Sequence, residues 1–382
     1  MFLYLQMFLT LWVFMFVETK PNFILILTDD QDLLLNGLVP MNRTLKLIAN
    51  YGKVFENAFV NSPICCPSRS TILTGKYAHN TGVVNNSIDG NCSSTFWQKR
   101  HEPFSMASVL KDNGYVTFYA GKYLNQKHWI VSMPPQELPG NVSILDDIQR
   151  RRLQTLLAVD ELVEKLINKL KESPGFIQCW GFKRNVLGQF TQPWDKRQPY
   201  ETDIRVPMLV RGPGIPRKTL ESYPVSSVDL APTILELADV EVPGDMDGKS
   251  FKNVLTSKER VQFIRHIFVE YWGEGNARSI DGRCPWKYDR NLAECSCDQW
   301  CKCQDSKNNT YTCVIDISNK QTFKFCRFED DQGFIEAYNI TEDPYELSNC
   351  YLKMDKAVVE SYLKRLERFE KCSGKKCDIF YA

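Results

Sequence analysis

The first apolar run after residue 20 constrains the fold of this chain most. Residues 22–28 read Asn-Phe-Ile-Leu-Ile-Leu-Thr and lie between Pro21 and the pair Asp29-Asp30. Such a continuous run is typical of a strand that is buried on both faces, as in a parallel sheet covered by helices. The two acids follow the carboxyl end of the strand, where open α/β sheets bind ligands. The sequence therefore predicts an α/β fold with a candidate site at Asp29 and Asp30.

Other periodic segments predict an α/β domain at residues 19–257 and a smaller α+β domain at residues 258–382. In the first domain we expect strands at 116–120 and 206–211 and helices at 44–51, 104–113, 148–170 and 227–238. In the second we expect short strands at 267–271 and 334–338 before a last helix at 356–371. Because residues 125–147 add little regular structure, we expect the central sheet to be truncated.

The N-terminus predicts entry into the secretory pathway. Residues 1–17 contain no charged residue, which is typical of the apolar core of a signal peptide, here placed at residues 1–18. A signal anchor is the alternative, although spans usually need about 17–25 residues. No later run is as long, so we expect no stable membrane span after cleavage. Glycosylation sequons agree with a lysosomal or secreted glycoprotein, and they lie at Asn42, Asn85, Asn91, Asn141, Asn308 and Asn339.

Charge and cysteine content narrow the class further. A net charge of +1 without a basic run excludes a nucleic-acid binder held by phosphate contacts. Ten of the 14 cysteines lie from Cys284 onward. In a cytosolic protein this cluster would suggest zinc, but its Cys-x-Cys spacings differ from those of structural zinc sites. In an oxidising compartment disulfides are the better interpretation, with a connectivity that the sequence does not give.

The segment Cys65-Cys66-Pro67-Ser68-Arg69 is the sharpest motif in the chain. Pro67 is well suited to the first turn of a helix, where its missing N–H group is no loss. Cys65 then lies at a helix N-terminus, where free N–H groups and the helix dipole favour an anion. Arg69 can add a bidentate cation. A lone cysteine here would ordinarily be assigned to a disulfide.

The spacing Cys-x-Pro-Ser-Arg resembles the signature of the sulfatase family. The resemblance implies an alkaline-phosphatase-like fold with a central, mostly parallel sheet. It also implies that a formylglycine-generating enzyme converts Cys65 to formylglycine, whose hydrated aldehyde attacks sulfur. The implied Ca²⁺ ligands are Asp29, Asp30 and Cys65, and the implied catalytic and sulfate-binding residues are Cys65, Arg69, Lys122 and Lys196. His79 could support the site from a second layer or be a plain loop residue.

Further stretches resemble those sulfatases that remove 6-O-sulfate from N-acetylglucosamine in glycosaminoglycans, at 83–86, 90–94, 154–157, 210–215, 308–311 and 338–341. The implied function is a lysosomal sulfuric ester hydrolase that degrades heparan or keratan sulfate. Extracellular heparan endosulfatases share much of this pattern, but their long basic insert is absent here. A related phosphodiesterase is the other alternative, and the cysteine at position 65, in place of threonine or serine, argues against it.

Two departures from the family pattern affect the site. The family has a longer segment where this chain has residues 125–127, including a histidine that acts on the leaving group, and none of His101, His128 and His266 matches it. Residues 174–187 are altered, so that Phe182 and Lys183 occupy the place of an Asp-Asn metal pair. A missing or wrongly joined exon would produce both defects. We therefore expect the 382-residue chain to be an inactive sulfatase-fold glycoprotein and a longer form to be the active enzyme.

Overall fold

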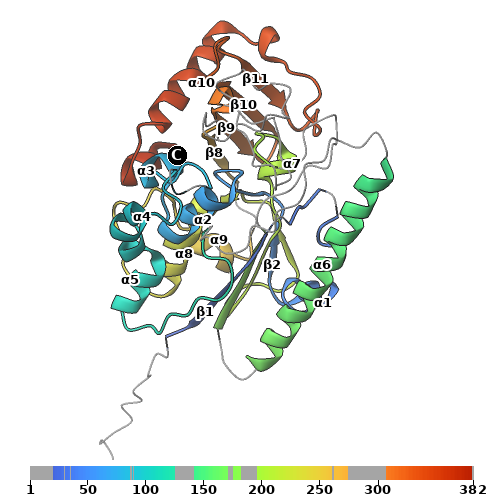
Figure 1. Ribbon diagram of the computed structural model, residues 1–382, viewed down its shortest axis with the longest axis vertical. Coiled ribbons are helices and arrows are strands. Elements are labelled where there is room, and N and C mark those ends of the chain that lie inside the picture. Colours follow the sequence, from blue (N-terminus) through green and yellow to red (C-terminus); the bar gives the residue numbers. More distant parts are fainter. Residues whose placement is uncertain are drawn as a thin grey trace, which may run out of the picture.

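The computed structural model describes residues 20–29, 31–34, 36–86, 88, 90–124, 142–170, 175–181, 196–259, 262–273 and 307–380. Within these ranges the chain forms a five-stranded sheet with helices on both sides, and a four-stranded sheet near the C-terminus (Figure 1). The expected signal peptide lies outside the described residues, as do Asp30, Asn141, His128 and the cysteines from Cys284 to Cys303. In the described part of the chain, no helix is both long and apolar enough to cross a bilayer.

The central sheet is mixed, with the strand order β1-β4-β5-β2-β6. Its strands are β1 (Asn22–Thr28), β4 (Gly175–Gly181), β5 (Met208–Arg211), β2 (Lys53–Phe55) and β6 (Thr219–Glu221). The pairs β1–β4 and β2–β6 are parallel, whereas β5 runs antiparallel to both β4 and β2. A short parallel pair, β3 (Ala58–Phe59) with β7 (Val225–Ser226), extends the α/β part.

The predicted first strand forms, but it is less buried than the sequence suggests. Asn22 is exposed and residues 23–27 are only partly buried. Within the described residues β1 ends the strand order, so that β4 alone pairs with it. The register joins Thr28 to Gly181, which places the carboxyl ends of β1 and β4 at the same edge of the sheet. The residues that follow these ends in the sequence are Asp29 and Phe182.

One side of the sheet is covered by α6 (Val142–Lys169) and α1 (Asn42–Leu47), which is followed by a 3₁₀ turn, Ala49–Tyr51 (Figure 1). The helix predicted at 148–170 therefore begins earlier than expected. On its apolar face, Leu156, Val163 and Ile167 are buried, whereas Leu157, Leu162 and Leu166 are exposed. The two helices are joined by Asp160, which accepts hydrogen bonds from the N–H groups of Arg43 and Thr44.

The other side of the sheet carries the main core and the helix with the cysteine motif. This side has α2 (Cys65–Thr74), α3 (Ala78–Thr81), α4 (Thr95–Arg100), α5 (Met106–Asp112), α8 (Leu230–Leu237) and α9 (Lys252–Thr256) (Figure 1). Every residue of α2 is buried. The helices predicted at 104–113 and 227–238 are confirmed, each with a preceding 3₁₀ turn, Glu102–Phe104 and Ser227–Asp229.

The strand predicted at residues 116–120 is wrong. These residues are not part of either sheet, and Val116 and Phe118 are 100% and 91% exposed. Valine, threonine and aromatic residues favour strands only where a neighbouring strand accepts them. In the described part of the chain no strand pairs with this segment.

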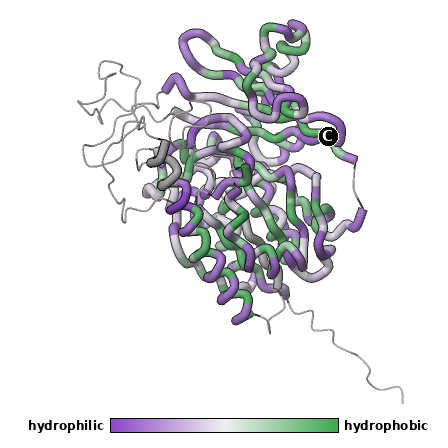
Figure 2. The backbone as a smooth tube through the Cα atoms, turned by 90° about the vertical axis from the view of Figure 1, so that its right-hand side faces the viewer, coloured by the Kyte–Doolittle hydropathy of each residue, from purple (hydrophilic) through white to green (hydrophobic). Residues whose placement is uncertain are grey.

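The C-terminal part is an antiparallel sheet in the order β11-β10-β9-β8, packed against one helix (Figure 1). Its elements are β8 (Ile264–Tyr271), β9 (Tyr311–Ser318), β10 (Thr322–Phe328), β11 (Ile335–Asn339) and α10 (Lys356–Phe369). Hydrophobic and hydrophilic stretches alternate along the tube in both parts of the molecule, as amphipathic elements require (Figure 2). The strands and the last helix predicted from the sequence are thus confirmed.

Disulfides, predicted from the composition, are present among the described cysteines. They join Cys66 to Cys92, Cys313 to Cys326 and Cys372 to Cys377. Five of the six sequons lie in described residues, and their asparagines are exposed or partly exposed, as glycosylation requires. Glycosylation itself stays a prediction.

Candidate active site

Cys65 is the first residue of α2, and it is only 3% exposed. Its neighbour Cys66 forms the disulfide with Cys92, whereas Cys65 takes part in no disulfide. Ile64 before it is extended and provides no side-chain cap, and the N–H group of Cys66 in the first turn donates to Oδ1 of Asn86 at 2.9 Å. The helix dipole makes this end favourable for a negative charge.

Arg69 joins the cysteine motif to two distant segments. It is 4% exposed, and its Nη2 lies 3.2 Å from Oδ1 of Asp29, directly after β1. Its Nη1 donates a hydrogen bond of 2.6 Å to the carbonyl oxygen of Lys122. The Nζ of Lys122 in turn lies 2.8 Å from Oδ2 of Asp29. The helix α2, the end of β1 and the segment around Lys122 therefore meet at one carboxylate.

The positive charge of Lys196 also acts on Asp29. Partial burial would raise the pKa of Asp29, but the positive charges of Lys196, Lys122 and Arg69 lower it well below its usual range. Asp29 is therefore ionised across the physiological pH range. We call Asp29, Arg69, Lys122 and Lys196 the cationic cluster, because three cations surround one carboxylate. Its net positive charge is suited to binding an anion.

Comparison with known proteins identifies the family. The family model described as Sulfatase matches residues 21–149, and one described as N-sulphoglucosamine sulphohydrolase, C-terminal, matches residues 190–283. The N-acetylglucosamine-6-sulfatases of Capra hircus and Homo sapiens are each 32% identical to this chain over 477 aligned positions. The alignments cover 94% of this chain and 85% and 86% of the two relatives. The chain belongs to the sulfatase family.

Solved structures agree with this assignment. The structure of BT4656 in complex with its substrate D-glucosamine-2-N,6-O-disulfate matches this chain with a TM-score of 0.62 and 18% identity. The match covers 95% of this chain and 98% of the BT4656 chain. The putative sulfatase yidJ from Bacteroides fragilis has a TM-score of 0.64 and 14% identity, with 94% and 96% covered. These neighbours confirm the predicted sulfatase fold. The protein is accordingly a sulfatase, an enzyme class that hydrolyses sulfuric esters.

The described residues of this sulfatase do not assemble a Ca²⁺ site. Within them, no group of three or more histidine, cysteine, aspartate or glutamate residues could hold a metal ion. Both carboxylate oxygens of Asp29 contact cations, and Asp30 lies outside the described part. At the same edge of the sheet β4 ends at Gly181, and the sequence continues with Phe182 and Lys183, which are not oxygen ligands.

His79 has a role that the sequence did not suggest. It lies in α3, and its Nδ1 is 3.0 Å from Oε1 of Glu270 on β8, while its Nε2 is 3.1 Å from the carbonyl oxygen of Cys372. Burial would lower the pKa of His79, but the Glu270 carboxylate raises it to about 9. The ring also packs edge-on against Phe369 of α10. His79 thus joins the helix after the cysteine motif to the C-terminal sheet and helix.

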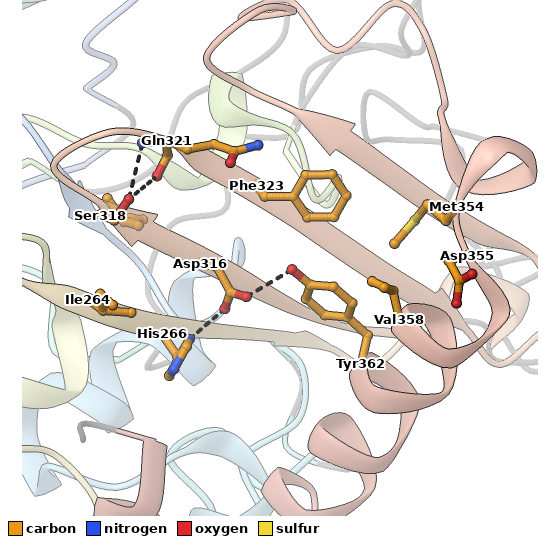
Figure 3. Close-up of a pocket in the computed structure, with 11 residues that line it drawn as sticks. Ile264, His266, Asp316, Ser318, Gln321, Phe323, Met354, Asp355, Val358 and Tyr362 are labelled. Carbon is orange, nitrogen blue, oxygen red and sulfur yellow. Dashed lines mark hydrogen bonds and ion pairs between the residues drawn. The ribbon is translucent and has the colours of Figure 1, made fainter.

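The other described histidines have partners away from the cationic cluster. His101 is buried and stacks on Trp97. His266 lines a pocket of about 440 Å³ formed by β8, β9, β10 and α10, where its Nδ1 faces Oδ1 of Asp316 (Figure 3). The contacts of these two histidines are thus with Trp97 and Asp316 rather than with Asp29.

Proposed function

We propose that this sulfatase removes 6-O-sulfate from N-acetylglucosamine units of glycosaminoglycans such as heparan or keratan sulfate. The observation that carries the proposal is the cationic cluster, which Arg69 joins to the cysteine-motif helix α2. The sulfate oxygens gain negative charge when a nucleophile attacks sulfur, and fixed cations stabilise that charge. The choice of substrate is supported by the 32% identity over 94% of the chain to N-acetylglucosamine-6-sulfatases.

The proposed nucleophile is Cys65 after conversion to formylglycine by the formylglycine-generating enzyme. One hydroxyl of its hydrated aldehyde attacks sulfur, and the sugar alcohol leaves with a proton. The second hydroxyl then loses its proton, the bond to the sulfate breaks, and the aldehyde is restored. The intact motif and the position of Cys65 outside any disulfide support this role. Peptide mass spectrometry should find formylglycine at Cys65, whereas a disulfide from Cys65 to another cysteine would contradict it.

The second candidate function is that of a sulfatase-fold glycoprotein without catalytic turnover, and the end of β4 favours it. Thr28 pairs with Gly181, so β4 ends at the same edge of the sheet as β1, which Asp29 follows. Family sulfatases have a metal pair at the positions of Phe182 and Lys183, and a lysine in that place would repel Ca²⁺. In the active form of the enzyme we propose Ca²⁺ as cofactor, with Asp29, Asp30 and the modified Cys65 among its ligands.

One set of assays separates the candidates. The purified chain is tested on 6-sulfated N-acetylglucosamine and on a phosphodiester, with Ca²⁺ and with a chelator, and Cys65→Ala is the control. Hydrolysis of the sulfate ester that Cys65→Ala abolishes supports the proposed function, and hydrolysis of the phosphodiester alone overturns it. If neither ester is cleaved, the double variant Phe182→Asp/Lys183→Asn tests the second candidate. A gain of Ca²⁺-dependent activity in that variant would assign the loss to the metal pair.

The proposed location is the lysosome, with secretion as the alternative. The alignment to the N-acetylglucosamine-6-sulfatase of Capra hircus covers 94% of this chain. The alignment to the putative extracellular sulfatase Sulf-1 homolog of Caenorhabditis elegans, 31% identical, covers 64% of this chain and 50% of that relative. Microscopy of the tagged protein beside a lysosomal marker, together with immunoblots of the medium, distinguishes the two.

A further inference from the structure

The backbone next to Lys196 has an unusual conformation. Arg197 has φ +143°, which residues other than glycine rarely adopt and which persists only where the surroundings hold it. Asp203 on α7 (Glu201–Ile204) provides one such contact, since its Oδ2 accepts the N–H groups of Arg197 at 3.0 Å and Gln198 at 2.9 Å. Asp203 is fully buried, so these hydrogen bonds are protected from water.

The C-terminal sheet provides the opposite contact. Tyr311, the first residue of β9, donates its hydroxyl to the carbonyl oxygen of Arg197 at 3.1 Å. Asn309 donates its side-chain amide to the same oxygen at 3.4 Å. Tyr311 is fully buried. The peptide group between Arg197 and Gln198 is therefore held at its N–H by Asp203 of the α/β part and at its carbonyl oxygen by Tyr311 of the C-terminal part.

A buried lysine on β10 holds the next residues. The ammonium group of Lys324 is fully buried and donates to the carbonyl oxygen of Pro199 at 2.7 Å. It also pairs with Glu346 and lies 3.5 Å from Oε1 of Glu201. Glu346 completes the contact, because its Oε2 accepts the N–H group of Glu201 at 2.7 Å. An ammonium group is costly to bury unless it is paired, so this arrangement has one favoured geometry.

These contacts could simply dock one part of the chain onto the other. Their location argues for more, because they fall on the residues directly after Lys196, including the one with the unusual φ. Lys196 itself is buried. We propose that Tyr311 and Lys324 are positioning residues for Lys196, so that the C-terminal sheet sets where its ammonium group meets a bound sulfate. This inference rests on the proposed sulfate-binding role of Lys196.

The test measures the dissociation constant of inorganic sulfate by titration calorimetry on the full chain. Lys196→Met should weaken sulfate binding about tenfold or more, since it removes a charge-assisted contact. Tyr311→Phe should weaken it several-fold in the wild-type background and have no further effect in the Lys196→Met background. Tyr362→Phe is the matched control, because its hydroxyl donates to Asp316 on β9 of the same sheet (Figure 3).

A second pair of variants repeats the test at Lys324. Lys324→Met should lower sulfate affinity only when Lys196 is present, and Lys320→Met, at an exposed lysine before β10, should leave it unchanged. If either positioning variant is too unstable to measure, Asn309→Ala removes a weaker contact to the same carbonyl oxygen.

The outcomes are distinguishable from failure of the proposed function. If Lys196→Met leaves sulfate affinity unchanged, the role of Lys196 is wrong and the positioning proposal fails with it. If Lys196→Met weakens binding but Tyr311→Phe and Lys324→Met do not, only the positioning proposal is overturned. An equal loss in both backgrounds would also overturn it, because a general structural effect does not depend on Lys196.

Discussion

The buried carboxylate of Glu346 should make this protein less stable as the pH rises from about 4.5 to about 7. Burial raises the pKa of Glu346 to about 7. The negative charge of Glu201 adds to this rise, whereas the positive charge of Lys324 opposes it. In the unfolded chain the pKa of a glutamate is about 4.3. Below that value the carboxyl is protonated in both states and contributes no difference. Above about 7 it is ionised in both, and the folded state bears the full penalty.

The size of this effect follows from the shift. A difference of about 2.5 pKa units corresponds to about 3 kcal/mol of unfolding free energy, which is an upper limit because the group is coupled to its neighbours. The charged and titratable groups that act on it are Lys324, Glu201, Tyr200 and Tyr338, and Glu336 interacts with the same Lys324. Burial also raises the pKa of Glu336, so its contribution has the same sign.

Thermal unfolding at a series of pH values, on the wild type and on Glu346→Gln, tests this reasoning. We expect the melting temperature of the wild type relative to the variant to fall by a few degrees between pH 4.5 and pH 8. Glu342→Gln, at an exposed glutamate shortly before Glu346, should keep the wild-type profile. If Glu346→Gln has the same pH profile as the wild type, the carboxylate does not titrate in the buried state and the reasoning is wrong.

Two further predictions concern the joints of the fold. Asp160→Ala should lower the unfolding free energy, measured by urea titration, by about 2 kcal/mol or more, because it leaves the N–H groups of Arg43 and Thr44 without their acceptor. Glu161→Ala, at an exposed position, should change the unfolding free energy little. Glu270→Gln should lower the pKa of His79 from about 9 toward its ordinary value, as a histidine proton NMR titration would show. The raised pKa of His79 stabilises the folded state below about pH 6.5, and that gain is lost as the pH rises through about 9. The variant should therefore be destabilised more at pH 6 than at pH 10. Equal destabilisation at the two pH values would contradict the ion pair.

The parts of the structure that depend on local sequence were predictable. The strand β1, the helix α2 at Pro67 and the buried strands and helix of the C-terminal part follow from apolar runs, helix-start chemistry and periodicity. Residues Lys122 and Lys196 were singled out only by resemblance, since a lone lysine is ordinarily a solvated surface charge. The structure places Lys122 in contact with Asp29 and the charge of Lys196 acts on the same carboxylate, while the catalytic roles of both lysines stay predictions.

The contacts that depend on tertiary partners were not predictable. Tyr311 lies 114 residues from Arg197 and Lys324 lies 125 residues from Pro199, and no pattern in either segment refers to the other. The long helix shows the same limit, because its periodicity does not say that Leu162 is 65% exposed while Val163 is buried. Periodicity states which residues share a face, and only the neighbouring elements decide whether that face is covered.

The exposed segment after α5 leads to the last prediction, that a longer form of this sulfatase exists. Val116, Phe118 and Tyr119 are 100%, 91% and 45% exposed, an apolar surface that soluble domains ordinarily cover. The alignment to the goat relative runs over 477 positions, more than the 382 residues of this chain, so that the relative has residues without a counterpart here. Sequencing the transcript across codons 120–190 should reveal additional coding residues. Chymotrypsin should cut the 382-residue form after Phe118 and spare the longer one, with Phe118→Ala as the control for the cut site. A transcript identical to the printed sequence, together with Ca²⁺-dependent hydrolysis of 6-sulfated N-acetylglucosamine by the 382-residue protein, would refute this prediction.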